Sequence, residues 1–466
     1  MDSYQFGTAL ELRDDIAKKR VSPVEVVKQT LERIDAVEPQ LNCFVTLTPD
    51  IAMDSARRAE KAIMRGDPVG PLHGIPISVK DLIAVGGIRQ TFGSRAMAEN
   101  IATVDAPSVS RVISAGACIV GKTTTSEFGC KAVGDSPLSG ITRNPWDVTK
   151  TPGGSSCGAA ASVAAGLTPF ALGTDGGGSI RAPAAFTGIV GIKPQFARVP
   201  VFPPSATPTL GHVGPLARTV RDAALLLSVI AGGDPRDPFS EQGRVPDFLG
   251  ACGLPVNKMR IAWSPTLGYG KPNTEVVRIT ESAVRTFEDL GCEIVVLDEG
   301  IGADPADIWT TEFYAGVGTR LSKILQEAPE LLDDAVANTL AMSAHQTMQS
   351  YYRTVFERYD FRERVRTLFD RFDLLFSPTV PIAACDVGVN VPPEFQGRNL
   401  CTWQYFTYPF NLTGQPAASI PAGFTSSGLP VGLQMVAKLG RETDIFRAAA
   451  AFEEARPWVQ RMPPVR

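Results

Sequence analysis

Histidine is scarce in this 466-residue sequence, which contains only three. So few imidazoles leave little scope for a multi-histidine metal site and few opportunities for a Ser-His-Asp triad. The surroundings of His73, His212 and His345 are ordinary, and we expect none of the three to be catalytic.

The sequence also lacks paired cysteines and long apolar runs. Its eight cysteines include no C-x-x-C pair, which in a chain of this length indicates reduced thiols in a reducing compartment. The longest nearly uncharged stretch, 151–180, consists mainly of Gly, Ala, Ser and Thr, unlike a membrane span. The N-terminus has no basic segment followed by an apolar one. We therefore expect a cytoplasmic protein with no membrane partner.

Neither sign of charge is in excess. The 45 basic and 49 acidic side chains give a net charge of −4, which argues against nucleic acid as the main partner. Apolar content of 44% and charged content of 20% are typical of a globular protein. What the sequence has in excess is glycine and proline, 43 and 37 residues, which predict tight turns and sites lined by backbone.

Helical and strand patterns alternate along the chain. A capping box at Ser22 with Pro23 begins a helix that we expect to end at Pro39. A β-branched strand ends at Lys80, a βαβ pattern covers 260–297, and 309–371 is helical in pattern. One large α/β domain is the first choice, with 220–258 as the candidate boundary if there are two.

A glycine-rich segment, 173–179, ends in Ser179 after three glycines. Consecutive unobstructed N–H groups can hold an anion, either a phosphate or the oxyanion of acyl transfer. The segment lacks the Lys-Ser/Thr of a Walker loop and the spacing of a dinucleotide fingerprint. A plain flexible loop is the remaining alternative.

A second small-residue segment, GGSS, places Ser155 upstream of Ser179. Serine needs a base to become a nucleophile, and with histidine scarce the candidate is Lys80, made neutral by burial. Lowering its pKa by about 3 units costs about 4 kcal/mol, within the reach of burial among apolar side chains. The alternative is that Lys80 reaches solvent or pairs with Asp81.

Together these segments resemble the amidase signature family, serine hydrolases with a Ser–cis-Ser–Lys triad. The resemblance rests on GPLHGIPISVKD at 70–81, GKTTTSEF at 121–128, GGSS at 153–156, GTDGGGSIRAPAAFTGIVGIKP at 173–194, PFNLTGQPA at 409–417 and GLPVG at 428–432. It spans nearly the full chain, and it implies one amidase domain over 1–466. The signature core would cover about 70–200, and the variable, substrate-determining region about 235–360.

The resemblance implies a twisted mixed β-sheet covered by helices on both faces, and no metal or organic cofactor. It makes Ser179 the nucleophile, Ser155 the bridging serine after a cis peptide, and Lys80 the base. The backbone N–H groups of Gly176, Gly177, Gly178 and Ser179 would form the oxyanion hole, and the loops would be braced by Ser156, Asp175 and Arg181.

The sequence departs from the family pattern at Cys157, Thr124 and Gln195, none of which belongs to the triad. We expect Cys157 to be a small buried residue. Aromatic residues are candidates for the wall of the acyl pocket: Phe128, Trp146, Tyr314 and those within 401–408.

The predicted function is hydrolysis of a small-molecule carboxylic amide to carboxylate plus ammonia or amine. The alternative is the glutaminase (A) subunit of a tRNA-dependent amidotransferase, for which Arg320 is available to bind the glutamine carboxylate. A more distant alternative is a non-catalytic nucleotide- or phosphate-binding protein. The amide itself is not defined by the sequence, and a homodimer is expected only on general grounds.

Overall fold

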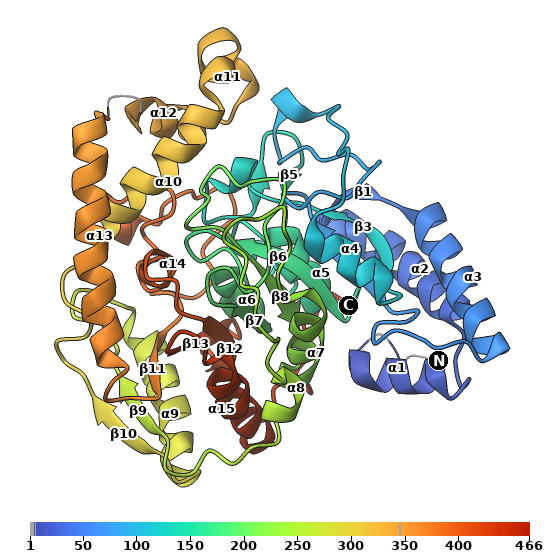
Figure 1. Cartoon of the computed structure of the whole chain (residues 1–466). Helices are drawn as coiled ribbons and strands as arrows, with labels where there is room; N and C mark the ends of the chain where they lie inside the picture. The colour runs from blue at the N-terminus through green and yellow to red at the C-terminus, as the bar shows by residue number, and fades with distance from the viewer. Residues whose placement is uncertain (1–3, 5, 344–345) are drawn as a thin grey trace.

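A mixed β-sheet of eleven strands runs through the protein, as the computed structural model in Figure 1 shows. The structure describes residues 4, 6–343 and 346–466. The strands are β1 Phe44–Leu47, β2 Pro76–Lys80, β3 Cys118–Thr123, β6 Phe170–Asp175, β7 Val190–Lys193, β8 His212–Ala217, β9 Arg260–Trp263, β10 Glu293–Val296, β11 Leu374–Pro378, β12 Ala417–Phe424 and β13 Pro430–Ala437. Strands β4 Asp135–Ser136 and β5 Gly140–Ile141 form a separate pair.

Helices and the loops between them make up most of the remaining chain. The helices are α1 Ala9–Ala17, α2 Pro23–Leu41, α3 Pro49–Arg65, α4 Pro107–Ser114, α5 Cys157–Ala164, α6 Arg181–Thr187, α7 Val220–Ile230, α8 Phe248–Ala251, α9 Thr274–Asp289, α10 Ala306–Arg320, α11 Ser322–Glu327, α12 Asp334–Ser343, α13 Met348–Leu368, α14 Pro409–Leu412 and α15 Glu442–Ala455. Short 3₁₀ turns are η1 Arg95–Met97, η2 Glu127–Gly129, η3 Pro329–Leu331 and η4 Pro393–Phe395.

The strand order is β1-β3-β2-β6-β8-β7-β12-β13-β11-β9-β10. Pairing is parallel across β3-β2-β6 and across β11-β9-β10, and antiparallel between these two blocks. Strands from before and after 220–258 belong to this one sheet. The chain is therefore a single α/β domain, and the mixed sheet expected from the resemblance is confirmed.

The alternation of side chains along β2 determines which of them lie on the face of the sheet where α5 packs. Ile77 and Val79 of β2 join the large apolar cluster that includes residues of α7, α9 and α15. Since neighbouring residues of a strand point to opposite faces, Lys80 points the other way, where α5 packs. A lysine at the end of this strand is thereby placed beside the loop that begins α5.

One expected helix end is wrong. Helix α2 does not end at Pro39 but continues to Leu41. Proline removes one N–H donor, but the Asn42 N–H still reaches the Glu38 carbonyl, and Asn42 adopts a left-handed φ of 54° that ends the helix.

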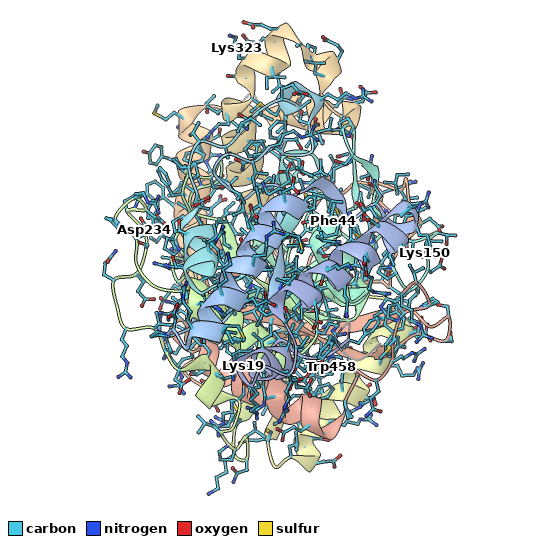
Figure 2. All side chains as sticks on the ribbon, turned by 90° about the vertical axis from the view of Figure 1, so that its right-hand side faces the viewer. Lys19, Phe44, Lys150, Asp234, Lys323 and Trp458 are labelled. Carbon is cyan, nitrogen blue, oxygen red and sulfur yellow. The ribbon has the colours of Figure 1, made fainter. Side chains whose placement is uncertain are left out.

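The predominantly helical segment 306–368 forms a layer at one end of the molecule. Helix α13 stands at its outer edge in Figure 1, and α10 lies between α13 and the centre of the molecule. Figure 2, turned by 90°, places Lys323 of α11 at the top of the molecule, with Lys19 and Trp458 in the lower half. Within the described ranges, no helix is both long and apolar enough to cross a membrane.

Candidate active site

The Lys80 side chain is buried and contacts three hydroxyl groups. Its Nζ lies 2.7 Å from Ser155 Oγ, 2.9 Å from Ser156 Oγ and 2.8 Å from Thr174 Oγ1. Ser155 follows a cis peptide bond from Gly154, as the resemblance implies. The structure thus brings together the lysine of β2, the GGSS loop before α5 and the end of β6.

Hydrogen bonding assigns different roles to these hydroxyls. Ser156 Oγ donates to the Thr174 carbonyl at 3.2 Å, so it accepts from Lys80. A neutral amine has two N–H bonds and one lone pair, so either Ser155 or Thr174 must donate to Lys80 when it is uncharged. The contact with Ser155 is the shortest of the three, and this arrangement allows the amine to take a proton from that serine.

Burial supplies the neutral amine. It lowers the pKa of Lys80 to about 7, against smaller opposing effects of Cys157 and Asp175. A substantial fraction of Lys80 is therefore unprotonated at neutral pH. The alternative, a lysine reaching solvent or pairing with Asp81, does not hold: Asp81 instead pairs with Lys122 at 3.0 Å.

The loop that carries Ser179 is held by the Asp175 carboxylate. Its Oδ1 accepts the Gly178 N–H at 2.7 Å, and its Oδ2 accepts the Ile180 N–H at 3.2 Å. Both oxygens also bind Arg181, which is itself fully buried. Burial raises the pKa of Asp175, but the Arg181 guanidinium outweighs it and holds the pKa well below its usual range.

Two side chains from distant segments fix the carbonyls of the same loop. Trp309 Nε1 of α10 donates to the Gly176 carbonyl at 2.8 Å, and Thr407 Oγ1 donates to the Gly177 carbonyl at 2.6 Å. A Cβ added at Gly177 would overlap the Trp309 ring, and one at Gly178 would overlap Thr407. Glycine is therefore required because two side chains pack directly on the backbone.

The predicted oxyanion hole needs one correction. The Gly178 N–H is occupied by Asp175, so it is not a free donor. Within the described part of the chain, no hydrogen bond is recorded for the N–H groups of Gly176, Gly177 or Ser179. These three N–H groups are the ones that remain for an anion in the loop.

A cavity of about 390 Å³ has Ser155 and Ser179 in its wall. Most of its lining is apolar: Leu82, Ile83, Phe92, Met97, Phe128, Val201, Phe202, Phe313, Val317, Leu321 and Ile324. Arg320 is the one cation of the lining, and no ion pair is recorded for it among the described residues. The cavity suits an uncharged apolar molecule with a polar group at the serines.

Of the aromatic residues predicted to line the acyl pocket, the structure places only Phe128 in the wall of this cavity, and none of those within 401–408 lines it. Trp146 instead donates to the Thr187 carbonyl and packs on Phe424 elsewhere. Tyr314 is buried, with its hydroxyl directed to the Cys130 carbonyl. Its neighbour Phe313 lines the cavity instead, because adjacent residues of a helix point about 100° apart.

Cys157 is the small buried residue expected, and two of the three histidines, His73 and His212, contact backbone carbonyls. Cys157 is buried beside Thr124, and burial raises the pKa of its thiol. His73 contacts the Ala59 carbonyl. His212 lines the cavity, but burial and then Lys193 lower the pKa of its ring well below the ordinary value. His345 lies outside the described residues.

Four functional contacts were not predicted: Thr174 at Lys80, Trp309 and Thr407 at the loop carbonyls, and Asn411, which donates to Asp175 at 2.8 Å. Asn411 stands in the PFNLTGQPA segment, whose likeness to the family was the one available signal. Thr174 stands in the GTDGGGS part of the 173–194 motif, whereas Trp309 and Thr407 come from segments without a motif.

Replacing Asp175 with asparagine is expected to lower both stability and turnover. The change leaves the Arg181 charge buried without its partner, at a cost of about 3–5 kcal/mol in the free energy of unfolding. Loss of the loop geometry should reduce kcat/KM by about 100-fold. Denaturant unfolding and steady-state kinetics measure the two effects.

The matched control for this change is Asp54→Asn, which removes an exposed partner of Arg57 on α3. It should change neither quantity, because exposed ion pairs contribute little. Full activity and stability in Asp175→Asn would show that the loop does not depend on this carboxylate.

Known proteins match nearly the whole chain. A model of the Amidase family matches residues 25–446. An acylamidase of Rhodococcus erythropolis is 36% identical over 462 residues, covering 98% of this chain and 97% of that protein. The A subunit of the glutamyl-tRNA(Gln) amidotransferase of Heliobacterium modesticaldum is 35% identical, covering 98% of both. The crystal structure of a bacterial aryl acylamidase of the amidase signature enzymes superposes with a TM-score of 0.93, at 32% identity and covering 98% of this chain and 97% of that one.

Proposed function

This chain belongs to the amidase family and hydrolyses amide C–N bonds, and we propose that it does so through an acyl-enzyme on Ser179, with Ser155 and Lys80 moving the proton. The observation that carries this assignment is the buried Lys80 amine, within hydrogen-bonding distance of Ser155 in the wall of a cavity that also contains Ser179. The family membership leaves the phosphate-binding alternative without support.

The first half of the reaction forms the acyl-enzyme. Neutral Lys80 takes the Ser155 proton, Ser155 takes the Ser179 proton, and Ser179 Oγ bonds to the amide carbonyl carbon. Collapse of the tetrahedral intermediate breaks the C–N bond, and the relay returns the proton to the leaving nitrogen. Water then attacks the ester by the same route and releases the carboxylate. No hydrogen bond between Ser155 and Ser179 is recorded among the described residues, so this step requires the closer approach that substrate binding commonly brings.

The oxyanion is stabilised by the remaining N–H groups of the glycine loop. Gly176, Gly177 and Ser179 offer N–H donors for which no partner is recorded among the described residues, while Trp309 and Thr407 hold the carbonyls of Gly176 and Gly177. Donors fixed before the reaction need no reorganisation as negative charge develops.

The apolar cavity supports an uncharged amide with a hydrophobic acyl or amine group as substrate. Burying one further aromatic ring, about 120 Å² of apolar surface, contributes about 3 kcal/mol. We expect an anilide or a benzoyl amide to exceed acetamide in kcat/KM by about 100-fold. Ammonia and aniline release across such a panel measures the preference, and acetamide as the best substrate would exclude an apolar pocket as the basis of specificity.

The glutaminase subunit of a tRNA-dependent amidotransferase is a second candidate. Two observations favour it: the 35% identity to the Heliobacterium modesticaldum protein, and the position of Arg320 in the cavity wall, suited to a substrate carboxylate. This function requires that the chain release ammonia from glutamine only when a second protein is present. The rate of that release should also fall in the Arg320→Gln variant. Hydrolysis of anilides by the isolated chain, with glutamine inert, would decide against it.

A further inference from the structure

Two phenylalanines in the wall of the catalytic cavity have a left-handed backbone. Phe92 has a φ of 54° and Phe128 a φ of 48°, a region that bulky residues rarely adopt. Seven non-glycine residues of the described chain have a positive φ, and these two are the ones that line the cavity of Ser155 and Ser179. Residues persist in such conformations where the surrounding structure over-determines them, and they gather at active sites and ligand clamps.

The two rings form one surface, which we call the Phe92–Phe128 pair. Their centroids lie 5.8 Å apart and their planes differ by 19°, and the Phe128 N–H donates to the Phe92 carbonyl at 2.8 Å. Both side chains are only partly buried, although the residues on either side of each are buried. The rings therefore keep free surface in the cavity wall. Such a surface suits another flat ring, which can pack on it face to face or edge to face.

Buried polar contacts hold the segments that carry the pair. Thr91 donates its N–H at 2.8 Å and its hydroxyl at 2.5 Å to the buried Asp81 carboxylate, which also pairs with Lys122. On the other segment, the Glu127 carboxylate accepts the Asp333 N–H at 2.7 Å. The two rings are thus positioned before any substrate binds, and a preformed surface loses little conformational entropy on binding.

The pair lies on the side of the cavity where Ser155 stands. Gly129, the residue after Phe128, packs so closely that a Cβ added to it would lie 3.3 Å from Ser155 Oγ. The ring of Phe313, by contrast, lies beside Gly176, where an added Cβ would be 3.1 Å from it. The aromatic residues of the cavity wall therefore belong to two different sides of the reacting centre.

The leaving amine of the substrate must lie on the Ser155 side. When the C–N bond breaks, Ser179 Oγ is bonded to the acyl carbon and carries no proton. The proton that the leaving nitrogen takes must then come from Ser155, which Lys80 can reprotonate. The nitrogen has to be within hydrogen-bonding reach of Ser155 Oγ, so the group attached to it extends toward this side of the cavity.

From this geometry we propose that the Phe92–Phe128 pair binds the amine part of the substrate and selects a flat aromatic amine. The enzyme would then cleave anilides in preference to amides of aliphatic amines, by contact between the aniline ring and the pair. The inference rests on the proposed function, because the position of the nitrogen follows from Ser155 as its proton donor. An aromatic ring on the acyl part would lie away from the pair.

Three amides separate the two ends of the substrate. Acetanilide and N-cyclohexylacetamide share the acetyl group and differ in whether the ring on nitrogen is flat, while benzamide carries its ring on the acyl side. Phe128→Leu removes the flat face but keeps an apolar side chain. It should lower kcat/KM for acetanilide, relative to N-cyclohexylacetamide, by about fivefold to tenfold, and change kcat/KM for benzamide little. The intrinsic reactivity of each amide is the same for every variant, so the change in the ratio reports contact with the pair.

Phe313→Leu is the matched control, since it makes the same change on the side of the cavity beside Gly176. It should not lower the ratio of acetanilide to N-cyclohexylacetamide. Phe92→Leu should lower this ratio as Phe128→Leu does, and it carries the test if Phe128→Leu does not fold. Thermal unfolding shows which variants are folded.

An unchanged ratio in the folded variants of Phe92 and Phe128 would overturn the proposal. So would an equal loss in Phe313→Leu, or a larger loss for benzamide than for acetanilide. These results are distinguishable from a failure of the proposed function. An acyl-enzyme on Ser179 with unchanged ratios would overturn this inference alone, whereas a folded wild type that forms no acyl-enzyme would overturn both.

Discussion

Replacing Ser179 with alanine is expected to lower kcat/KM for amide hydrolysis by at least about 10⁴-fold, because it removes the oxygen that we propose forms the acyl-enzyme. The residual rate would come from substrate binding and the oxyanion donors, which the change leaves in place. Stability should be unaffected, since no structural hydrogen bond is recorded for the Ser179 hydroxyl among the described residues. Steady-state kinetics with an anilide, beside thermal unfolding, measures both quantities.

Cys157→Ala is the matched control, because it tests whether Cys157 rather than Ser179 is the nucleophile. Cys157 lies two residues after Ser155, but its thiol is buried, and burial raises its pKa. A buried thiol is mostly protonated and unreactive. Cys157→Ala should retain turnover within about tenfold, and loss of activity in Cys157→Ala with activity preserved in Ser179→Ala would reverse the assignment.

Replacing Lys80 with methionine is expected to reduce kcat/KM by about 10³-fold or more, because it removes the proton acceptor but nearly preserves the volume of the side chain. In the wild type, kcat/KM should rise with pH and reach half of its plateau near the Lys80 pKa of about 7. Below that pH the amine is protonated and cannot take the Ser155 proton. The pH–rate profile measures this directly, and a flat profile between pH 5 and 9 would argue against a lysine base.

The lowered pKa of Lys80 should also make the stability of the protein depend on pH. The Lys80 pKa is about 7 in the folded protein, while an unfolded chain has the ordinary value near 10.4. Between these values the unfolded state binds more protons, so the free energy of unfolding rises with pH. Relative to Lys80→Met, the wild type should gain about 1.4 kcal/mol per pH unit from pH 7 to 10. An equal dependence in both proteins would show that Lys80 has an ordinary pKa when folded.

The sequence was sufficient to single out the residues that we propose react. Lys80, Ser155 and Ser179 stand in segments whose composition is unusual, a β-branched strand and two small-residue loops. The structure adds that Lys80 faces the GGSS loop because Ile77 and Val79 face the other side of the sheet. Period-two alternation in a strand is a local property, which is why it can be predicted.

The contacts that hold the glycine loop could not be predicted in the same way. Trp309 and Thr407 lie more than a hundred residues from Ser179, and nothing in their neighbours marks them as partners of its carbonyls. The aromatic residues that line the cavity were mostly not predicted, for a related reason. Trp146, Phe313 and Tyr314 are alike in type, and only the packing of α10 and α6 decides which of them faces the cavity.

The acyl-enzyme on Ser179 is the central claim. Detecting this covalent adduct by mass spectrometry is the most direct test of it. The protein is mixed with a slowly hydrolysed anilide at low temperature, quenched in acid within the first turnover, and digested for peptide mass spectrometry. We predict one acyl group, on the peptide that contains Ser179, and no acylation of the Ser179→Ala variant. An acyl group on Cys157 or Ser155, or an unmodified protein during rapid turnover, would contradict the account.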